Sequence, residues 1–411
     1  INNLKLRGSY GKMGDDSVAD YQFISGYDYP NTDGDRYNKT PKGYFFNGSF
    51  MNSLGFRAVA NPNITWYTVK TLNVGIDADL WNGLLGVSFD LFQRDRDNLM
   101  ANRIATIPGT FGAAMPKENL ESDRTKGFEV ELRHRNRVGQ VNYSVSGNIA
   151  ITRSMWRYKE RTPSGNSYDN WRNNLTNRYN DIWFGYGADG RYTSWEQIAN
   201  SHIFAGNATL PGDYVYEDWN GDGMIDENDQ HDVGNPFPDF SFGLRMGGEW
   251  KGFDFNLFFD GMTGNKIYNY QRYCLESGKF NGNYSTKLAN SWRPDNQNTD
   301  IPRFSKTDGI DNGLAFTDRW LEDGSYFRLK TLDIGYSLPK SLLKKVKLEN
   351  VRIYTSMENL FTLSKYSGYS PDLGESGSVD IGVGYNVFSR GVDQGRYPLP
   401  RTISFGIQVS L

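Results

Sequence analysis

The sequence has very few of the residues that build covalent or catalytic centres. It contains one cysteine, Cys274, in 411 residues, so no internal disulfide can form. No histidine lies near this thiol in the sequence, and a Cys-based metal site is therefore not expected. The motifs GxSxG and HExxH and a glycine-rich phosphate loop are all absent, and the three histidines, His134, His202 and His231, are far apart. We predict that the chain is not an enzyme.

Long apolar runs and an excess of one charge are also missing. No run of 18 apolar residues occurs, which excludes helical membrane spans. The mean hydropathy is −0.65, but a strand that alternates polar and apolar residues can cross a membrane at such an average. The net charge is −3, and the 45 basic residues are scattered among 48 acidic ones without a basic stripe. This distribution argues against a nucleic-acid partner.

A strict alternation of apolar and polar residues is present at residues 401–411. The apolar positions are Ile403, Phe405, Ile407, Val409 and Leu411, and the residues between them are small or polar. A period of two indicates a strand with one apolar and one polar face. At roughly 10 residues, such a strand has the length of a tilted strand in a transmembrane barrel.

The same alternation predicts nine further strands. They cover approximately residues 4–11, 68–80, 85–95, 128–138, 141–151, 240–250, 253–259, 326–336 and 351–357. The strand at 326–336 is the least regular, because its apolar residues follow one face only from Leu332 onward. The connector that follows it predicts one helical turn over residues 341–346.

The connections between the predicted strands alternate strictly between short and long. The long loops are expected at residues 12–66, 96–125, 154–238, 263–325 and 361–400. Such one-sided sorting is typical of outer-membrane barrels, which have short periplasmic turns and long extracellular loops. The prediction is an all-β, transmembrane antiparallel β-barrel, with residues 1–411 forming the C-terminal part of one barrel domain and the C-terminus in the periplasm.

Two further expectations follow from a membrane barrel. Trp81 and Trp250 beside short turns, and Trp66, Trp156 and Trp320 near long loops, predict two interfacial aromatic girdles. Uncapped strand edges cannot remain in lipid, so more strands are expected before Ile1. The sequence begins there without a signal peptide or a lipidation motif, and it is expected to be processed or to be part of a longer chain.

A calcium-loop pattern occurs in the longest predicted loop. Oxygen-bearing residues stand at positions 1, 3, 5, 9 and 12 of residues 218–229, a glycine stands at position 6, and a backbone carbonyl is expected at position 7. Asp229 replaces the usual glutamate, and no amphipathic helices flank the loop, so the prediction is a structural Ca²⁺ site. A hydrated turn is the alternative. The predicted ligands are Asp218, Asn220, Asp222, Met224, Asp226 and Asp229.

The same loop is rich in aromatic residues. These rings could stack on sugar faces or anchor a protein lid, or they could form a small apolar core that folds the loop on itself. The sequence does not distinguish between these roles. The residues are Trp171, Tyr179, Trp183, Phe184, Tyr186, Tyr192 and Trp195.

Phrases at the strand edges resemble the C-terminal half of the SusC/RagA-type TonB-dependent transporters of Bacteroidetes, and the Asp218 loop resembles one found in that family. They span nearly the whole chain in order. In one-letter code they are FQRDRDNL at 92–99, KGFE at 126–129, NPFPDF at 235–240, YFRLKTL at 326–332, ENLFT at 358–362, YSGY at 366–369 and PRT at 400–402.

This resemblance implies a 22-stranded outer-membrane barrel of which these are the last ten strands. It further implies TonB-dependent import of an oligosaccharide or peptide, a SusD-like surface lipoprotein as partner, and an N-terminal plug and TonB box that are absent from this sequence. Pairing of two transporter–lipoprotein units is a further expectation.

Three alternatives stay open. A passive porin or adhesin-like barrel would be excluded by a plug domain before Ile1. An outer-membrane enzyme would need a Ser/His/acid cluster that faces one loop. A soluble all-β binding protein would not need detergent for solubility.

Overall fold

The structure is a computed structural model. It describes residues 1–18, 22–29, 32–33, 40–56, 59–103, 115–161, 163–180, 182–203, 209–278, 280, 282–304, 317–344, 347–373 and 390–410.

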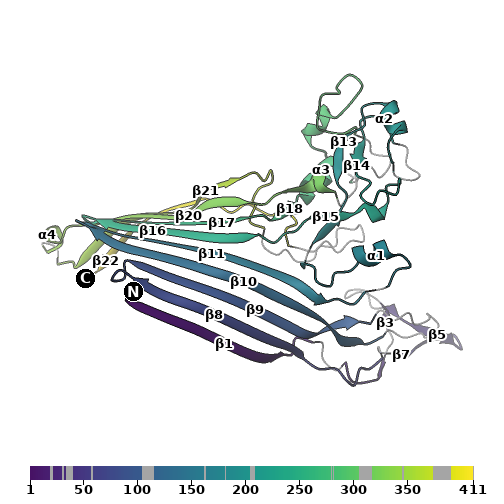
Figure 1. The fold of residues 1–411 in the computed structure, drawn as a ribbon, viewed down its shortest axis with the longest axis horizontal. Helices are drawn as coiled ribbons and strands as arrows, with labels where there is room; N and C mark the ends of the chain where they lie inside the picture. Colours follow the sequence, from purple (N-terminus) through teal and green to yellow (C-terminus); the bar gives the residue numbers. More distant parts are fainter. Residues whose placement is uncertain are drawn as a thin grey trace.

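Ten long strands form one antiparallel sheet, in which each strand pairs with the next one along the chain (Figure 1). The predicted all-β, antiparallel fold class and the ten predicted strands are confirmed. The strands are β1 (Asn3–Asp15), β8 (Tyr67–Leu80), β9 (Leu85–Asn102), β10 (Lys117–Val138), β11 (Val141–Tyr158), β16 (Phe240–Trp250), β17 (Phe253–Thr263), β20 (Tyr326–Ser337), β21 (Asn350–Ser364) and β22 (Thr402–Ser410).

Short and long connections lie at opposite ends of this sheet. Figure 1 shows both chain termini and the short turns at one end, and the long loops at the other. Trp81, Asn82 and Lys251 adopt positive φ values of 52°, 55° and 47° in the tight turns, a conformation that right-handed strand twist favours in short hairpins. The predicted helical turn at 341–346 is α4 (Lys340–Leu343), and Val346 lies outside the described residues.

One face of the sheet is apolar and exposed. The register aligns Leu6, Ile76, Phe89, Val130 and Ile149 across five strands. Leu6 is 73% exposed and Ile149 is 45% exposed, so no second layer covers this row. We call it the apolar face. It continues to β22 through four residues that are all exposed, while Leu411 lies outside the described residues; the four are Ile403, Phe405, Ile407 and Val409.

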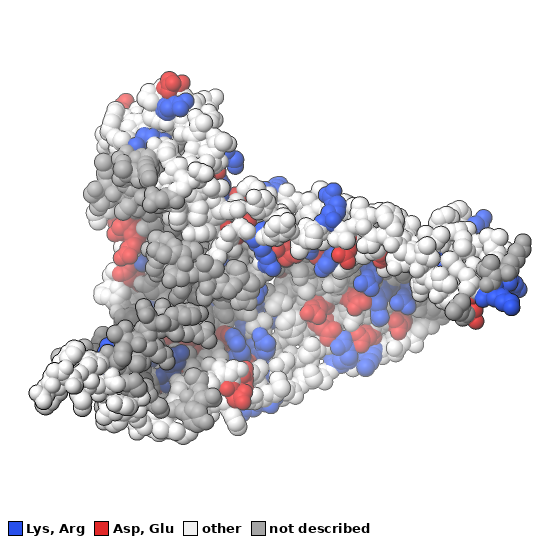
Figure 2. Space-filling model, turned by 180° about the vertical axis from the view of Figure 1, so that it is seen from behind, with Lys and Arg blue, Asp and Glu red and all other residues white. Residues whose placement is uncertain are grey.

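The opposite, polar face carries charged residues. Arg7, Asp77, Ser88 and Glu131 alternate with apolar-face residues on their strands. Figure 2 looks at the molecule from behind, where the sheet is hollowed and charged side chains of both signs gather along the strands. The sheet therefore separates an apolar surface from a hydrophilic hollow.

A β-bulge explains the irregular strand at 326–336. The pairing of β17 with β20 passes directly from Phe259–Leu329 to Phe258–Thr331, so Lys330 is the extra residue on β20. Leu329 pairs with Phe361 and Leu332 pairs with Met357, so apolar residues lie on one face both before and after the bulge. An added residue reverses the alternation that follows it. The apolar residues are therefore odd-numbered before the bulge and even-numbered after it, although they lie on the same face of the sheet.

Several strands continue beyond their predicted ends. β9 runs to Asn102, β10 begins at Lys117 and β11 reaches Tyr158, so the connection between β9 and β10 is only residues 103–116. The apolar alternation stops earlier because charged pairs replace it, such as Arg124 with Asp95 at 2.6 Å. Backbone pairing continues through these rows.

The long loops contain short elements of their own, and part of them stands away from the sheet (Figure 1). We define the loop lobe as the described parts of residues 182–234, 264–323 and 390–393. None of the helices among the described residues has the length and apolarity to cross a membrane. The elements of the lobe are β12 (Trp183–Gly185), β13 (Ala188–Arg191), α2 (Trp195–Ala199), β14 (Tyr214–Tyr216), η2 (Glu227–Asp229), β15 (His231–Gly234), β18 (Lys266–Tyr268), α3 (Tyr270–Glu276), η3 (Thr286–Asn290), η5 (Asp318–Trp320) and β19 (Leu321–Asp323).

Shorter elements occur elsewhere in the loops. Three two-stranded ribbons lie between β1 and β8, and one helix lies between β11 and β12. They are β2 (Tyr27–Asp28) with β7 (Gly55–Phe56), β3 (Thr32–Asp33) with β4 (Thr40–Pro41), β5 (Gly43–Phe46) with β6 (Ser49–Asn52), and α1 (Ser167–Arg172).

Candidate functional site

Ion pairs line the polar face of the sheet. The Arg7 guanidinium on β1 donates to Asp77 on β8 at 2.7 Å and to Asp90 on β9 at 2.8 Å, so it links three strands. Arg328 donates to Asp260 at 2.6 Å in the same way at the long-loop end. Paired charges keep a surface hydrophilic, and their mutual attraction offsets the desolvation free energy of the charged side chains.

A cavity of about 490 Å³ lies on this polar face. Its lining combines carboxylates, hydroxyls, an amide and one guanidinium, all of which can exchange hydrogen bonds with a polar solute or with water. The polar lining residues are Ser88, Asp90, Glu129, Glu131, Ser146, Asn148 and Arg245.

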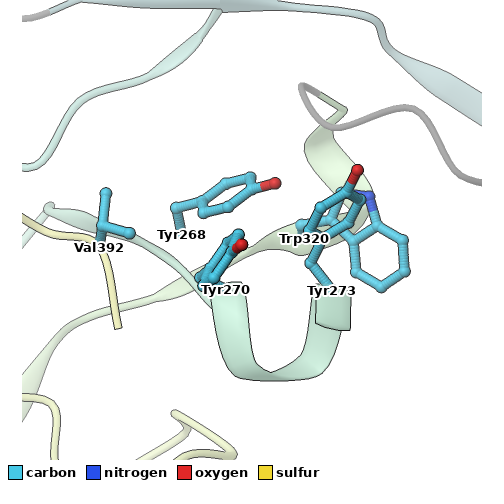
Figure 3. Packing of buried hydrophobic residues seen from close by; sticks show 5 residues of the cluster. All are labelled: Tyr268, Tyr270, Tyr273, Trp320 and Val392. Carbon is cyan, nitrogen blue, oxygen red and sulfur yellow. The ribbon is translucent and has the colours of Figure 1, made fainter. Parts of the chain in front are cut away.

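The loop lobe has an aromatic core. Tyr268, Tyr270, Tyr273, Trp320 and Val392 are all buried and pack together, and Trp320 has no exposed surface (Figure 3). The Tyr273 and Trp320 rings meet edge to face with centroids 5.4 Å apart. The prediction that Trp320 belongs to an interfacial girdle is therefore wrong, because its indole is the centre of a loop core. By contrast, Trp66, Trp81 and Trp250 are half or more exposed.

Backbone pairing joins two loops that are far apart in sequence. The Tyr268 N–H donates to the Gly391 carbonyl at 2.8 Å, and the Asp393 N–H donates to the Tyr268 carbonyl at 2.9 Å. The Tyr366 hydroxyl donates to the Asp393 carboxylate at 2.5 Å. Burial raises the pKa of the Tyr268 phenol, so the ring stays neutral within the core.

A partly buried carboxylate, Glu322, supports the same junction. It accepts hydrogen bonds from the Ser367 N–H and hydroxyl, both at 2.8 Å, and from the Asn269 amide at 3.0 Å. Burial alone would raise the pKa of Glu322, but these donors outweigh it and hold that pKa below its usual range. The carboxylate therefore stays charged and links the loop segments that contain Asn269 and Ser367.

The lone cysteine lies beside this core. Cys274 on α3 is partly buried and packs against the aromatic cluster. Burial raises the pKa of its thiol, which lowers the fraction of reactive thiolate.

The structure assigns the aromatic residues of the longest loop to different environments. Tyr186 and Tyr192 are buried, and Tyr186 belongs to a small cluster with Tyr216 and Ile225. Trp171, Tyr179 and Trp195 are exposed. The interpretation as a small apolar core is confirmed for the buried rings, whereas a stacking or lid-anchoring role of the exposed rings stays a prediction.

A second cavity, of about 660 Å³, lies among the exposed rings. Trp219 and His231 stack at its edge with centroids 3.9 Å apart and planes 11° apart. The Arg178 guanidinium lies 4.8 Å from the centre of the Trp171 ring. Trp219 and His231 were not among the aromatic candidates, although their neighbours in the calcium pattern were singled out. The aromatic part of the lining is Trp171, Tyr179, Phe184, Trp219 and His231.

The Asp218 loop folds around its own carboxylates. Asp218 accepts hydrogen bonds from the N–H groups of Gly221 at 2.8 Å and Gly223 at 2.9 Å. Asp229 accepts from the N–H groups of Asn220 at 3.3 Å and Asp226 at 2.7 Å. The first and last predicted ligands thus both turn toward the loop backbone.

The remaining predicted ligands are engaged in similar turns. Asn220 and Asp222 accept from N–H groups two residues further on, at 2.9 Å each. Asp226 caps η2 and accepts from the Asn228 N–H at 2.7 Å. The Met224 side chain is 53% exposed, and only its carbonyl was predicted to be a ligand.

The chemistry of this donor set fits a hard cation, since every predicted donor is an oxygen. Asp229 has no exposed surface. Burial raises its pKa, and the charges of Asp218 and Asp226 add to that effect. Nevertheless, within the described part of the chain, no three His, Cys, Asp or Glu side chains converge closely enough to hold a metal ion. Calcium therefore stays a prediction.

The comparisons with known proteins cover the whole chain. No family model matches it. TonB-dependent receptor P3 of Formosa agariphila is 29% identical over the entire chain and 39% of that receptor's length. The TonB-dependent receptor SusC of Bacteroides thetaiotaomicron is 24% identical over the entire chain and 38% of its length. The chain is similar to TonB-dependent receptors over its whole length. It spans about 40% of the length of these curated relatives.

The fold agrees with this relationship. The structure of the RagAB peptide transporter superposes on 99% of the chain and 41% of the matched transporter chain, with a TM-score of 0.71 and 21% identity. The resemblance to SusC/RagA-type TonB-dependent receptors that the strand-edge phrases indicated is confirmed.

The candidate site of this chain has two parts. The first is the polar face with its ion pairs. The second is the loop lobe with its aromatic cavity at the long-loop end.

Proposed function

We propose that the chain is the C-terminal barrel part of a TonB-dependent receptor that imports a nutrient across the bacterial outer membrane. The ten strands would be the last ten of 22, with the apolar face in lipid and the polar face toward the lumen. The short turns and both chain ends of this part would lie in the periplasm. A catalytic role is not part of this proposal.

The observation that carries the proposal is that the two faces of this sheet, and its two ends, differ from each other. One face is apolar and exposed across ten strands, the other is lined by ion pairs, and every long loop leaves from the same end. Lipid satisfies an exposed apolar band, whereas a monomeric soluble protein rarely exposes one of this extent. The similarity of the whole chain to the matched parts of TonB-dependent receptors supports the same assignment.

Energy and partners follow from the receptor assignment. We expect the TonB complex of the inner membrane to act through a plug domain and a TonB box, and a SusD-like surface lipoprotein to close the long-loop end. RagAB, to which the fold is similar, is named as a peptide transporter. Two transporter–lipoprotein pairs would associate in the complete assembly.

The substrate class is an oligosaccharide or a peptide. The polar face offers hydrogen-bonding groups to either. The exposed rings of the aromatic cavity can stack on sugar faces or on aromatic side chains of a peptide. The loop lobe would capture the ligand before it enters the lumen.

Whole-cell uptake tests this function. Cells that lack the full-length gene should fail to accumulate one oligosaccharide or peptide that wild-type cells import, and dissipation of the proton gradient should stop import in wild type. Import that continues without the gradient would indicate a passive porin. Release of the protein without detergent would indicate a soluble binding protein, and hydrolysis of the substrate by purified protein would indicate an enzyme.

Calcium removal gives a separate prediction for the Asp218 loop. Metal analysis of the purified receptor should find bound calcium, and chelation should increase proteolysis of residues 218–229. Asp222→Ala should have the same effect as chelation, because it removes the oxygen at position 5. Asp232→Ala, which alters a carboxylate just outside the pattern, is the matched control. An absence of bound calcium, with unchanged proteolysis in Asp222→Ala, would contradict the site.

A further inference from the structure

Two pairs of positively charged side chains face each other across neighbouring strands on the apolar side of the sheet. Lys12 on β1 is the register partner of Lys70 on β8, and Lys126 on β10 is the partner of Arg153 on β11. Directly opposed residues have Cβ atoms roughly 4.5 to 5.5 Å apart, and like charges at this spacing destabilise a sheet. An anion bound between them would remove the repulsion.

These pairs lie immediately beyond the apolar band, at its long-loop edge. The row with Lys126 also contains Tyr10, Leu72 and Gln93, and the adjacent row contains Lys12 and Lys70. We call these residues and their charged neighbours the basic rim. It has six cations and three carboxylates, namely Lys12, Lys70, Arg124, Lys126, Arg153 and Arg157 with Asp95, Asp97 and Asp239.

Four of the six cations already have carboxylate partners. Lys70 pairs with Asp97 at 2.8 Å, Arg157 pairs with the same carboxylate at 3.2 Å, and Arg124 and Arg153 each have an aspartate of their own. Lys12 and Lys126 are exposed and form no ion pair with any residue that the structure describes. The rim thus keeps a positive charge after its internal pairing.

The opposite edge of the apolar face differs. Near the short turns, the apolar-face positions of β1 and β8 to β11 carry no Lys or Arg among the described residues, and His134 there bonds the Tyr143 hydroxyl at 3.0 Å. Exposed Trp81 and Trp250 flank that edge. Positive charge therefore gathers at only one of the two edges of the apolar band on these strands.

We propose that the basic rim binds the phosphate groups of anionic lipids in the outer leaflet, of which lipid A is the expected kind. This rests on the proposed function, since it requires the apolar face to be in the outer membrane with the long loops outside. The acyl chains would cover Val74, Leu91 and Phe128, and the phosphates would then lie at Lys126 and Lys12. Ammonium groups bind phosphate oxygens through charge-assisted hydrogen bonds.

The spacing of the two cation pairs suits a lipid with more than one phosphate. Three strand intervals separate the β1–β8 pair from the β10–β11 pair, which is roughly 14 Å at the usual strand spacing. Each pair can therefore hold its own phosphate, on one lipid or on two neighbouring lipids.

Binding of lipid A to the purified full-length receptor in detergent tests the proposal. Native mass spectrometry should show binding of diphosphorylated lipid A, and Lys12→Gln with Lys126→Gln should weaken it roughly 10- to 30-fold, as expected for the loss of two surface charges. Lys12→Arg with Lys126→Arg should retain binding. Lys5→Gln with Arg135→Gln removes two charges from the same strands on the polar face and should change nothing.

Three results would overturn the proposal. They are unchanged affinity in the Lys12→Gln, Lys126→Gln variant, equal binding of dephosphorylated lipid A, and displacement of lipid A by an equal concentration of inorganic phosphate, which would indicate a free-anion site. Membrane fractionation and nutrient uptake are measured in cells that produce the wild-type receptor or the variant. If the Lys12→Gln, Lys126→Gln variant loses lipid affinity but keeps normal uptake, the basic rim is supported. If the wild-type receptor is absent from the outer membrane, the proposed function itself is refuted.

Discussion

Replacement of Ile149 by arginine should lower the free energy of unfolding by about 2 to 4 kcal/mol in lipid vesicles, the range found for Arg at the midplane of membrane barrels. Ile149 belongs to the apolar row and lies between Val130 on β10 and Phe242 on β16, and its side chain is 45% exposed. A guanidinium at this position would lie in hydrocarbon without a partner. Guanidinium chloride titration of the refolded full-length receptor measures the change.

The matched control lies one residue earlier on the same strand. Asn148 lines the polar cavity together with Glu129 and Glu131, so Asn148→Arg adds the same side chain among carboxylates. We expect a change within about 0.5 kcal/mol, as for a surface substitution. Equal destabilisation by both variants would contradict the assignment of the two faces.

Truncation of Trp320 to alanine should destabilise the loop lobe by about 3 to 5 kcal/mol, the usual cost for a fully buried aromatic residue. Its indole packs on the Tyr273 ring and has no exposed surface. The ten-stranded sheet contributes no residue to this core, so the loss should be local. Hydrogen exchange should become faster in residues 264–304 and 390–393, while exchange in β16 and β17 stays unchanged.

Trp195→Ala is the control within the same lobe. Trp195 begins α2 and is 62% exposed, so we expect an effect of about 0.5 kcal/mol or less. If Trp320→Ala left hydrogen exchange unaltered, the aromatic cluster would not stabilise the lobe. If it unfolded the sheet as well, the lobe and the sheet would form one cooperative unit.

Periodicity was sufficient to predict the sheet. The positions of the strands follow from apolar residues at every second position, because one face of each strand contacts a uniform apolar environment. Strand β20 departs from this pattern at its bulge. Periodicity does not predict the strand ends that lie beyond the apolar band. Beyond the apolar band, Arg124 and Asp95 stabilise the strands by pairing, so the apolar pattern stops several residues before the backbone ladder ends.

The loops were predictable only as loops. Trp320 looked like an interfacial residue because it precedes a strand, but its surroundings come from residues 268–273 and from Val392, about 70 residues further along the chain. Similarly, Trp219 and His231 stack across the Asp218 loop. Contacts of this kind depend on how separate loops fold against each other, and local periodicity carries no information about that.

The aromatic core of the lobe is assembled without a contribution from the barrel strands. The three segments of the lobe, residues 182–234, 264–323 and 390–393, could therefore be grafted together onto a related receptor, and they should keep their fold there if all three are transferred, because Trp183 also packs against the core. A chimera that receives only one of them would lose the Tyr268–Gly391 hydrogen bond and the packing of Val392. Recombination between receptors that import different substrates would then succeed only when the three segments are exchanged as a set.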